Sequence, residues 1–223
     1  MAISHKSSGA VASSSGSITG TYAIGDLIII GVYNDASNTI PTVVNGWAVT
    51  GSSAGGGNAL LVAWKYAQST SETFGTWTNA TFLSWNIYSG SAGLILPGRS
   101  SFSSGTSGSG GTITFGSLVV ASGSATERWI NTIVGHKSNN TDIETAPSGF
   151  TARSNVAGGS TGEIATHDSS ANTTSTSVSP ITLSTGTSAS WRSSAIELIE
   201  GGWLPSSGSS ARPVHPLFQN VIG

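Results

Sequence analysis

Residues 26–33 read Asp-Leu-Ile-Ile-Ile-Gly-Val-Tyr, a short apolar run that is rich in β-branched side chains and bounded by polar turns. Residues 128–135 read Arg-Trp-Ile-Asn-Thr-Ile-Val-Gly, a second run of the same kind. Such runs are typical of β-strands. The two stretches predict strands at equivalent places in a chain that contains a repeat, related by a pseudo-two-fold axis.

Three further landmarks follow each run in the same order, so that four landmarks recur with offsets of 102 to 109 residues. They are a Pro/Gly turn that leads to an aromatic residue, a Gly-rich loop with the strand after it, and a closing strand (40–47, 51–67 and 82–89; 146–150, 158–168 and 191–199). We therefore expect copy one at about 9–90 and copy two at about 111–200. Residues 97–111, which are mostly Ser and Gly, are predicted to be a flexible linker between them.

The apolar residues of the predicted strands alternate with a period of two, as in a β-strand and not in a helix. In 59–67 the expected inner set is Leu60, Val62, Trp64 and Tyr66. Because one such sheet would leave its apolar face wet, we predict an all-β fold, a jelly-roll-like β-sandwich of two diverged four- to five-stranded repeats over 18–200. Extended arms are expected at 1–17 and 201–223. The aromatic residues predicted to lie buried between the sheets are Trp47, Trp64, Phe150 and Trp191.

The composition is polar without being charged. Charged residues make up 8% of the chain, the formal net charge is −2, and there are 30 Gly and no Cys. This excludes the basic patch of a nucleic-acid-binding protein, disulfides and thiolate metal sites. No stretch is long and apolar enough for a secretory signal or a membrane helix, so we expect folding in a cytoplasm and no membrane partner.

Two groups of residues resemble catalytic or metal sites. The loops at 51–55 and 158–162 match the Gly-x-Ser-x-Gly pattern around Ser53 and Ser160. That pattern needs a strand that feeds a helix, and neither loop precedes a predicted helix. The densest set of metal-ligand side chains is His136, Asp142, Glu144, His167 and Asp168. Neighbouring strand residues point to opposite faces, so His167 and Asp168 should not share an ion. We therefore expect no enzymatic activity, no metal and no cofactor.

The more informative candidates are binding residues. Trp77, with Asn79 beside it, lies outside the repeated strand positions and is predicted to be available for stacking on a glycan. After the predicted sandwich, a Gly/Ser/Pro tether leads to an apolar C-terminal peptide. An apolar peptide of this kind tends to aggregate unless it docks on a partner. The predicted docking residues are Trp203, Leu204, Val214, Leu217, Phe218, Val221 and Ile222.

Several of these motifs resemble a family of two-repeat β-sandwich proteins among the structural gene products of tailed bacteriophages. The motifs are Gly-Asp-Leu-Ile-Ile at 25–29, Asn-Gly-Trp at 45–47, Trp-Lys-Tyr at 64–66 and Tyr-Ser-Gly at 88–90. The second copy keeps 147–150 and the strand from Trp191 but lacks the opening Gly-Asp. The resemblance covers most of 20–200 and implies a virion component without catalytic residues.

The leading hypothesis is therefore a structural protein of a tailed-phage virion, assembled in the host cytoplasm and displayed on the particle surface. It would be docked on capsid or tail proteins by its arms, as a homo-oligomer within a symmetric assembly. The alternative is an adhesin or carbohydrate-binding module that recognises a host surface glycan.

Overall fold

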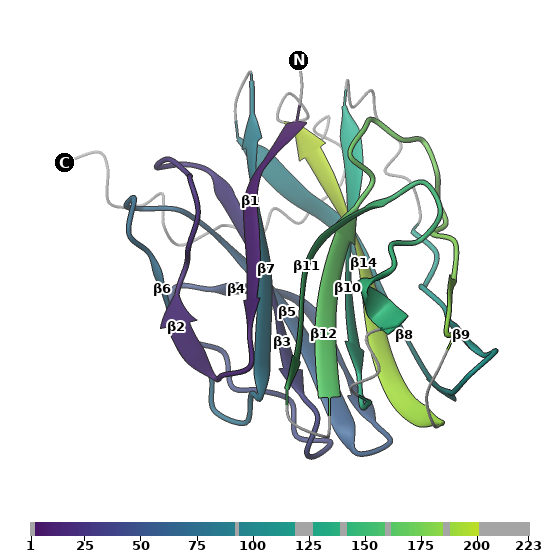
Figure 1. Cartoon of the computed structure of the whole chain (residues 1–223). Helices are drawn as coiled ribbons and strands as arrows, with labels where there is room; N and C mark the ends of the chain where they lie inside the picture. The colour runs from purple at the N-terminus through teal and green to yellow at the C-terminus, as the bar shows by residue number, and fades with distance from the viewer. Residues whose placement is uncertain are drawn as a thin grey trace, which may run out of the picture.

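The computed structural model of the chain describes residues 3–91, 94–118, 127–138, 142–158, 162–184 and 188–200, and they form a sandwich of two five-stranded antiparallel sheets (Figure 1). The predicted all-β sandwich is thus confirmed. Within these ranges the helical element is a single 3₁₀ turn, η1 (Asp142–Glu144). No helix of the described residues is long and apolar enough to cross a membrane.

The first sheet is built from the N-terminal half of the chain. Its strands, in spatial order, are β1 (Ile3–Val11), β7 (Phe82–Gly90), β3 (Leu27–Asn34), β5 (Asn58–Tyr66) and β4 (Ala48–Gly55). A two-stranded ribbon of β2 (Ser15–Ser17) and β6 (Thr73–Thr76) completes this half. The central strand β3 is buried along its whole length, as its continuous apolar run requires.

The second sheet repeats this order. Its strands are β8 (Ile95–Ser107), β14 (Ala189–Glu200), β10 (Arg128–His136), β12 (Gly162–Asp168) and β11 (Thr151–Gly158), and its ribbon is β9 (Thr112–Ile113) with β13 (Ile181–Thr182). β3 and β10 hold the same central place, as the sequence repeat predicts. The β4–β5 and β11–β12 ladders also carry their bulges at matching positions, after Val49 and after Ala152. The chain finishes the first sheet before starting the second, so it does not alternate between sheets as in a jelly roll.

The two sheets pack on each other reciprocally. β1 packs against β11 while β4 packs against β8, so each outer strand meets the counterpart of the opposite edge. At the centre, a Cβ on Gly31 would lie 2.4 Å from Cγ2 of Ile133, and a Cβ on Gly135 would lie 2.3 Å from Cδ2 of Tyr33. Each glycine thus faces the residue that corresponds to it in the other copy. Such contacts are expected next to a two-fold axis, although the superposition of the copies stays a prediction.

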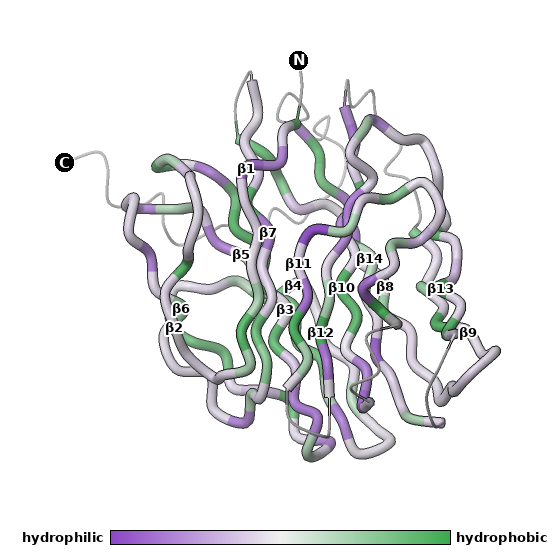
Figure 2. Tube along the Cα trace, in the orientation of Figure 1, coloured by the Kyte–Doolittle hydropathy of each residue, from purple (hydrophilic) through white to green (hydrophobic). Residues whose placement is uncertain are grey.

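Apolar side chains fill three layers and not one. Figure 2 colours the hydrophobic residues green, and they recur along the strands of both sheets. Alternate residues of β3 point into the space between the sheets, as Leu27 and Ile29 do, or to the outer face, as Ile28 and Ile30 do. The inner alternation predicted for 59–67 is confirmed, because its four residues all belong to or pack against the core between the sheets. The outer face of each sheet is covered by its own loops and ribbon.

The extra layers correct the predicted placement of the aromatic residues. Trp47 and Trp191 are buried on the outer faces of the first and second sheet, not between the sheets. Phe150 is half-buried on the outer face of the second sheet. Only Trp64 packs against the core between the sheets, and it is half-buried there. The prediction assumed a single apolar layer, whereas the loops provide a second surface for burial on each sheet.

Two segments predicted to be flexible are edge strands. Residues 3–11 of the predicted N-terminal arm form β1, which pairs with β7, and residues 97–107 of the predicted linker belong to β8, which pairs with β14. Their small residues have a packing role. A Cβ on Gly9 would lie 2.3 Å from the Trp85 ring, and one on Gly105 would lie 2.6 Å from the Trp191 ring. Each edge strand therefore has a glycine at the point where an indole of the neighbouring strand packs against it. From composition alone, these Ser- and Gly-rich strands resemble linkers. The predicted C-terminal arm, 201–223, lies outside the described residues.

Candidate binding site

The structure contradicts the predicted glycan contact at Trp77. The β2–β6 ribbon carries this residue over the outer face of the first sheet, where its side chain is 0% exposed and meets Trp47 edge-to-face at 5.7 Å between ring centroids. Asn79 is exposed, but it is a turn residue with φ of 66° and has no exposed indole beside it. The predicted docking residues Trp203, Leu204, Val214, Leu217, Phe218, Val221 and Ile222 lie outside the described residues.

The predicted metal-ligand set is spread over separate partners. Nδ1 of His136 lies 3.0 Å from Oε1 of Glu163, while Asp168 accepts two hydrogen bonds of 2.8 Å from the Arg153 guanidinium. Nε2 of His167 donates to the carbonyl of Ile143 on the outer face, opposite to Asp168, as the strand alternation predicts. The described residues contain no group of three or more His, Asp or Glu side chains that could share a metal ion.

We expect His167 to make the fold sensitive to acid. The pKa of His167 is lowered to about 4. Burial lowers this pKa by more than the hydrogen bond to Ile143 and the nearby Asp168 carboxylate raise it. A lowered pKa means that the unfolded chain takes up the proton first as the pH falls below about 6.5, so stability is lost between about pH 6.5 and pH 4. We expect a loss of roughly 2 kcal/mol from pH 7 to pH 5, at about 1.36 kcal/mol per pH unit.

Urea unfolding at several pH values will measure this loss. A His167→Gln variant should be less stable than the parent chain at pH 7 but should lose less stability on acidification. Burial also lowers the pKa of His5, so the variant should keep a smaller acid sensitivity of the same sign. An unchanged slope in the variant would show that His167 is not the group responsible.

The Gly-x-Ser-x-Gly loops lie in β-hairpins. Residues 51–55 belong to β4, and the chain returns at once as β5. Ser53 therefore lacks the strand-to-helix turn that exposes a nucleophile at the top of a sheet. β11 and β12, which precede and follow the second loop, pair with each other antiparallel, and Ser160 lies outside the described residues.

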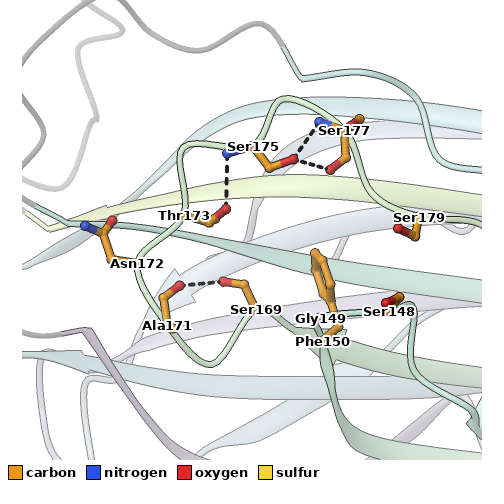
Figure 3. Close-up of a pocket in the computed structure, with 10 residues that line it drawn as sticks. All are labelled: Ser148, Gly149, Phe150, Ser169, Ala171, Asn172, Thr173, Ser175, Ser177 and Ser179. Carbon is orange, nitrogen blue, oxygen red and sulfur yellow. Dashed lines mark hydrogen bonds between the residues drawn. The ribbon is translucent and has the colours of Figure 1, made fainter.

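A pocket of about 310 Å³ opens on the outer face of the second sheet (Figure 3). It lies between the turn that precedes β11 and the loop 169–180 that joins β12 to β13. In the close-up, the ring of Phe150 stands between Ser169 and Ser179. The lining residues are Ser148, Gly149, Phe150, Ser169, Ala171, Asn172, Thr173, Ser175, Ser177 and Ser179.

A buried arginine holds the loop in place. The side chain of Arg128 forms an ion pair with Glu197, and both residues are buried. Its Nη1 donates to the carbonyls of Thr173 at 3.2 Å and Ser175 at 2.6 Å, and its backbone N–H donates to Oδ1 of Asn172. The loop therefore takes its shape from a charge-assisted anchor beneath it, which orders the pocket wall before any ligand arrives.

The wall presents polar groups that are not used by the fold. The hydroxyls of Ser148, Ser177 and Ser179 are on exposed residues, and none makes a hydrogen bond to any part of the chain that the structure describes. By contrast, the hydroxyls of Ser169 and Ser175 are engaged with backbone groups of the loop. The pocket thus combines one aromatic ring with several free hydroxyls.

The equivalent place in the first copy is closed. Trp47 replaces Phe150, and it is covered by Trp77 and by the ammonium group of Lys65, 4.9 Å from the ring centroid. Leu183 is the residue that corresponds to Trp77. Trp77 donates its N–H to the carbonyl of Ser14, just before β2, and Leu183 donates its N–H to the carbonyl of Gly111, just before β9. The smaller side chains of the second copy leave room for the pocket.

One sequence signal could have indicated this site. In copy one the loop from β5 to β6 has six residues (67–72). The equivalent loop of copy two, from β12 to β13, has twelve (169–180). Eight of those twelve are Ser or Thr. An extended hydroxyl-rich loop beside the repeated aromatic position marks where the copies diverge. Comparisons of the chain with protein-family models, curated proteins and solved structures find no match.

Proposed function

We propose that this chain is a non-enzymatic structural protein of a tailed-phage virion, a surface-displayed β-sandwich docked on capsid or tail proteins through its C-terminal segment. The sequence motifs that resemble such proteins support it, as does a sandwich whose polar surface comes from Ser, Thr and Gly and not from charges. The neutral surface suits a protein packed beside many copies of itself.

The observation that carries the proposal is an apolar group at one end of the sandwich. Ile24 is 70% exposed, Leu94 42% and Leu96 39%. Gly25, the chain neighbour of Ile24, lies near Leu94, because a Cβ on Gly25 would be 4.0 Å from Cδ2 of Leu94, and Leu96 follows two residues after Leu94. Leu96 pairs with Ile199 of β14, whose last residue, Glu200, leads into the tether. The chain thus leaves the sandwich next to its exposed apolar residues, so the tethered peptide and this end can meet the same partner.

Deletion of 204–223 tests the docking role. Particles stripped of the protein should rebind the full-length labelled chain, and electron microscopy with an antibody to the sandwich should place it on the surface. The truncated chain should not rebind, yet its melting temperature should equal that of the full chain. A lower melting temperature in the truncated chain would show that the peptide belongs to the fold, and an unlabelled particle would refute the virion assignment.

The second candidate function is an adhesin or carbohydrate-binding module of a phage. The contact first predicted for it, through Trp77, is excluded by the burial of that residue. The pocket around Phe150 favours the same function at a different place, because it offers an aromatic ring and free hydroxyls on an exposed surface.

A further inference from the structure

We propose that the pocket between Phe150 and the loop 169–180 is a binding site for one uncharged sugar residue. The pocket volume of about 310 Å³ falls at the small end of the range for ligand sites, about 300–1,000 Å³. It therefore suits a single small ring and not an extended polymer groove. This site does not depend on the virion assignment, since it would bind the sugar wherever the protein acts.

The lining specifies a neutral ligand. None of the ten lining residues is charged, and the groups available are hydroxyls, one carboxamide and backbone. A phosphate, sulfate or carboxylate would lose its hydration here without gaining a cation. A sugar hydroxyl can both donate and accept, and so can a serine hydroxyl. The polar groups of the wall thus match those of a neutral saccharide.

The polar groups are arranged around the aromatic ring. Ser148 and Ser179 lie on one side of the Phe150 ring and Ser169 lies on the other, while Asn172 lies at the far end of the pocket (Figure 3). The carboxamide of Asn172 accepts from Arg128 through Oδ1, which leaves its Nδ2 as a donor. A sugar ring could therefore place its C–H face on Phe150 and its hydroxyls on the rim. Small-molecule sites usually combine an apolar surface with a few fixed polar groups in this way.

The site is formed in advance of binding. Arg128 fixes the backbone at Thr173 and Ser175. The Ser175 hydroxyl in turn donates to the carbonyl of Ser177 and accepts from the N–H of Ser177. Because the wall is already ordered, little conformational entropy remains to be lost on binding. The first copy provides an internal comparison, since Trp47, Trp77 and Lys65 occupy the corresponding space.

Saturation-transfer difference NMR on the full chain tests the proposal, with glucose, galactose, N-acetylglucosamine, mannose and rhamnose as probes at millimolar concentration. At least one should receive saturation, and a Ser177→Ala/Ser179→Ala variant should weaken its binding by about tenfold or more. Both hydroxyls are free of internal bonds, so the variant should fold normally. The control, Thr174→Ala/Thr176→Ala, changes two exposed residues of the same loop outside the pocket and should bind as the parent does.

Three results would overturn the proposal. One is the absence of transfer to every probe, and another is binding that both double variants leave equal to the parent. The third is preferential binding of a charged sugar such as glucuronate. A glycan array then separates two sources of the ligand. If the ligand is a free monosaccharide, the protein will not bind the immobilised glycans, and if it is the terminal sugar of a glycan chain, the protein will bind them. Either source supports the site.

Discussion

Replacing Gly31 by valine is expected to destabilise the sandwich by about 3 kcal/mol or more. A Cβ at this position would lie 2.4 Å from Ile133 and 3.3 Å from Ile164, both on the opposite sheet. Overpacking of a core usually costs about 1–3 kcal/mol, and here the central strands of two sheets would have to separate. The higher strand propensity of valine offsets at most about 1 kcal/mol of this loss. Urea unfolding monitored by tryptophan fluorescence measures it.

A double-mutant cycle with Ile133 identifies the cause. Ile133→Ala alone should cost about 2–5 kcal/mol through the cavity that it leaves. Combined with Gly31→Ala, it should cost less than the sum of the single changes by at least about 1 kcal/mol, because the new methyl occupies the vacated space. Ser52→Val, on an exposed position of the edge strand β4, serves as the control and should change stability by no more than about 0.5 kcal/mol. Additive effects at 31 and 133 would contradict the close approach of the two sheets.

The same contact shows what the sequence could predict. The run at 26–33 and its counterpart at 128–135 identified the two central strands, because β-branched residues that are buried on both faces leave a continuous apolar signal. Nothing in either run shows that Gly31 must face Ile133 and that Gly135 must face Tyr33. That pairing depends on how the sheets stack, a long-range property that periodicity does not report.

The wrong predictions have a common physical origin. Residues 3–11 and 95–107 are rich in Ser and Gly, a composition shared by flexible linkers and by edge strands that pass closely under large side chains. Trp77 lay outside the repeated strand motifs and was predicted to be exposed, but the β2–β6 ribbon folds it onto the first sheet. In both cases tertiary packing, and not local preference, decided the outcome.

The pocket could be predicted only in part. Its aromatic position was visible, because Phe150 follows a Pro/Gly turn as Trp47 does. The remainder depends on differences between the copies: a longer loop, Leu183 in place of Trp77, and an arginine beneath the loop. These features become meaningful only when the equivalent positions of the two sheets are known from the strand order and the matching bulges.

Replacing Arg128 by methionine is the second change with a large expected effect, about 3–5 kcal/mol of lost stability. It would leave the Glu197 carboxylate buried without its partner, which is the costly way to break a buried ion pair. It would also remove the donor to the carbonyls of Thr173 and Ser175. We therefore expect both a lower urea midpoint and faster hydrogen exchange in 169–180.

The double variant Arg128→Met/Glu197→Ile separates these two roles. In the first copy the residue at the place of Glu197 is Ile87, so an apolar side chain is compatible with this position of the sheet. Replacing both members of a buried ion pair by apolar residues is often neutral, so the double variant should recover most of the stability lost by Arg128→Met. The loop carbonyls would still lack their donor, so fast exchange in 169–180 and weak sugar binding should persist. Recovery of slow exchange in the double variant would show that the ion pair, and not the contacts of Arg128 to the loop, maintains the pocket wall.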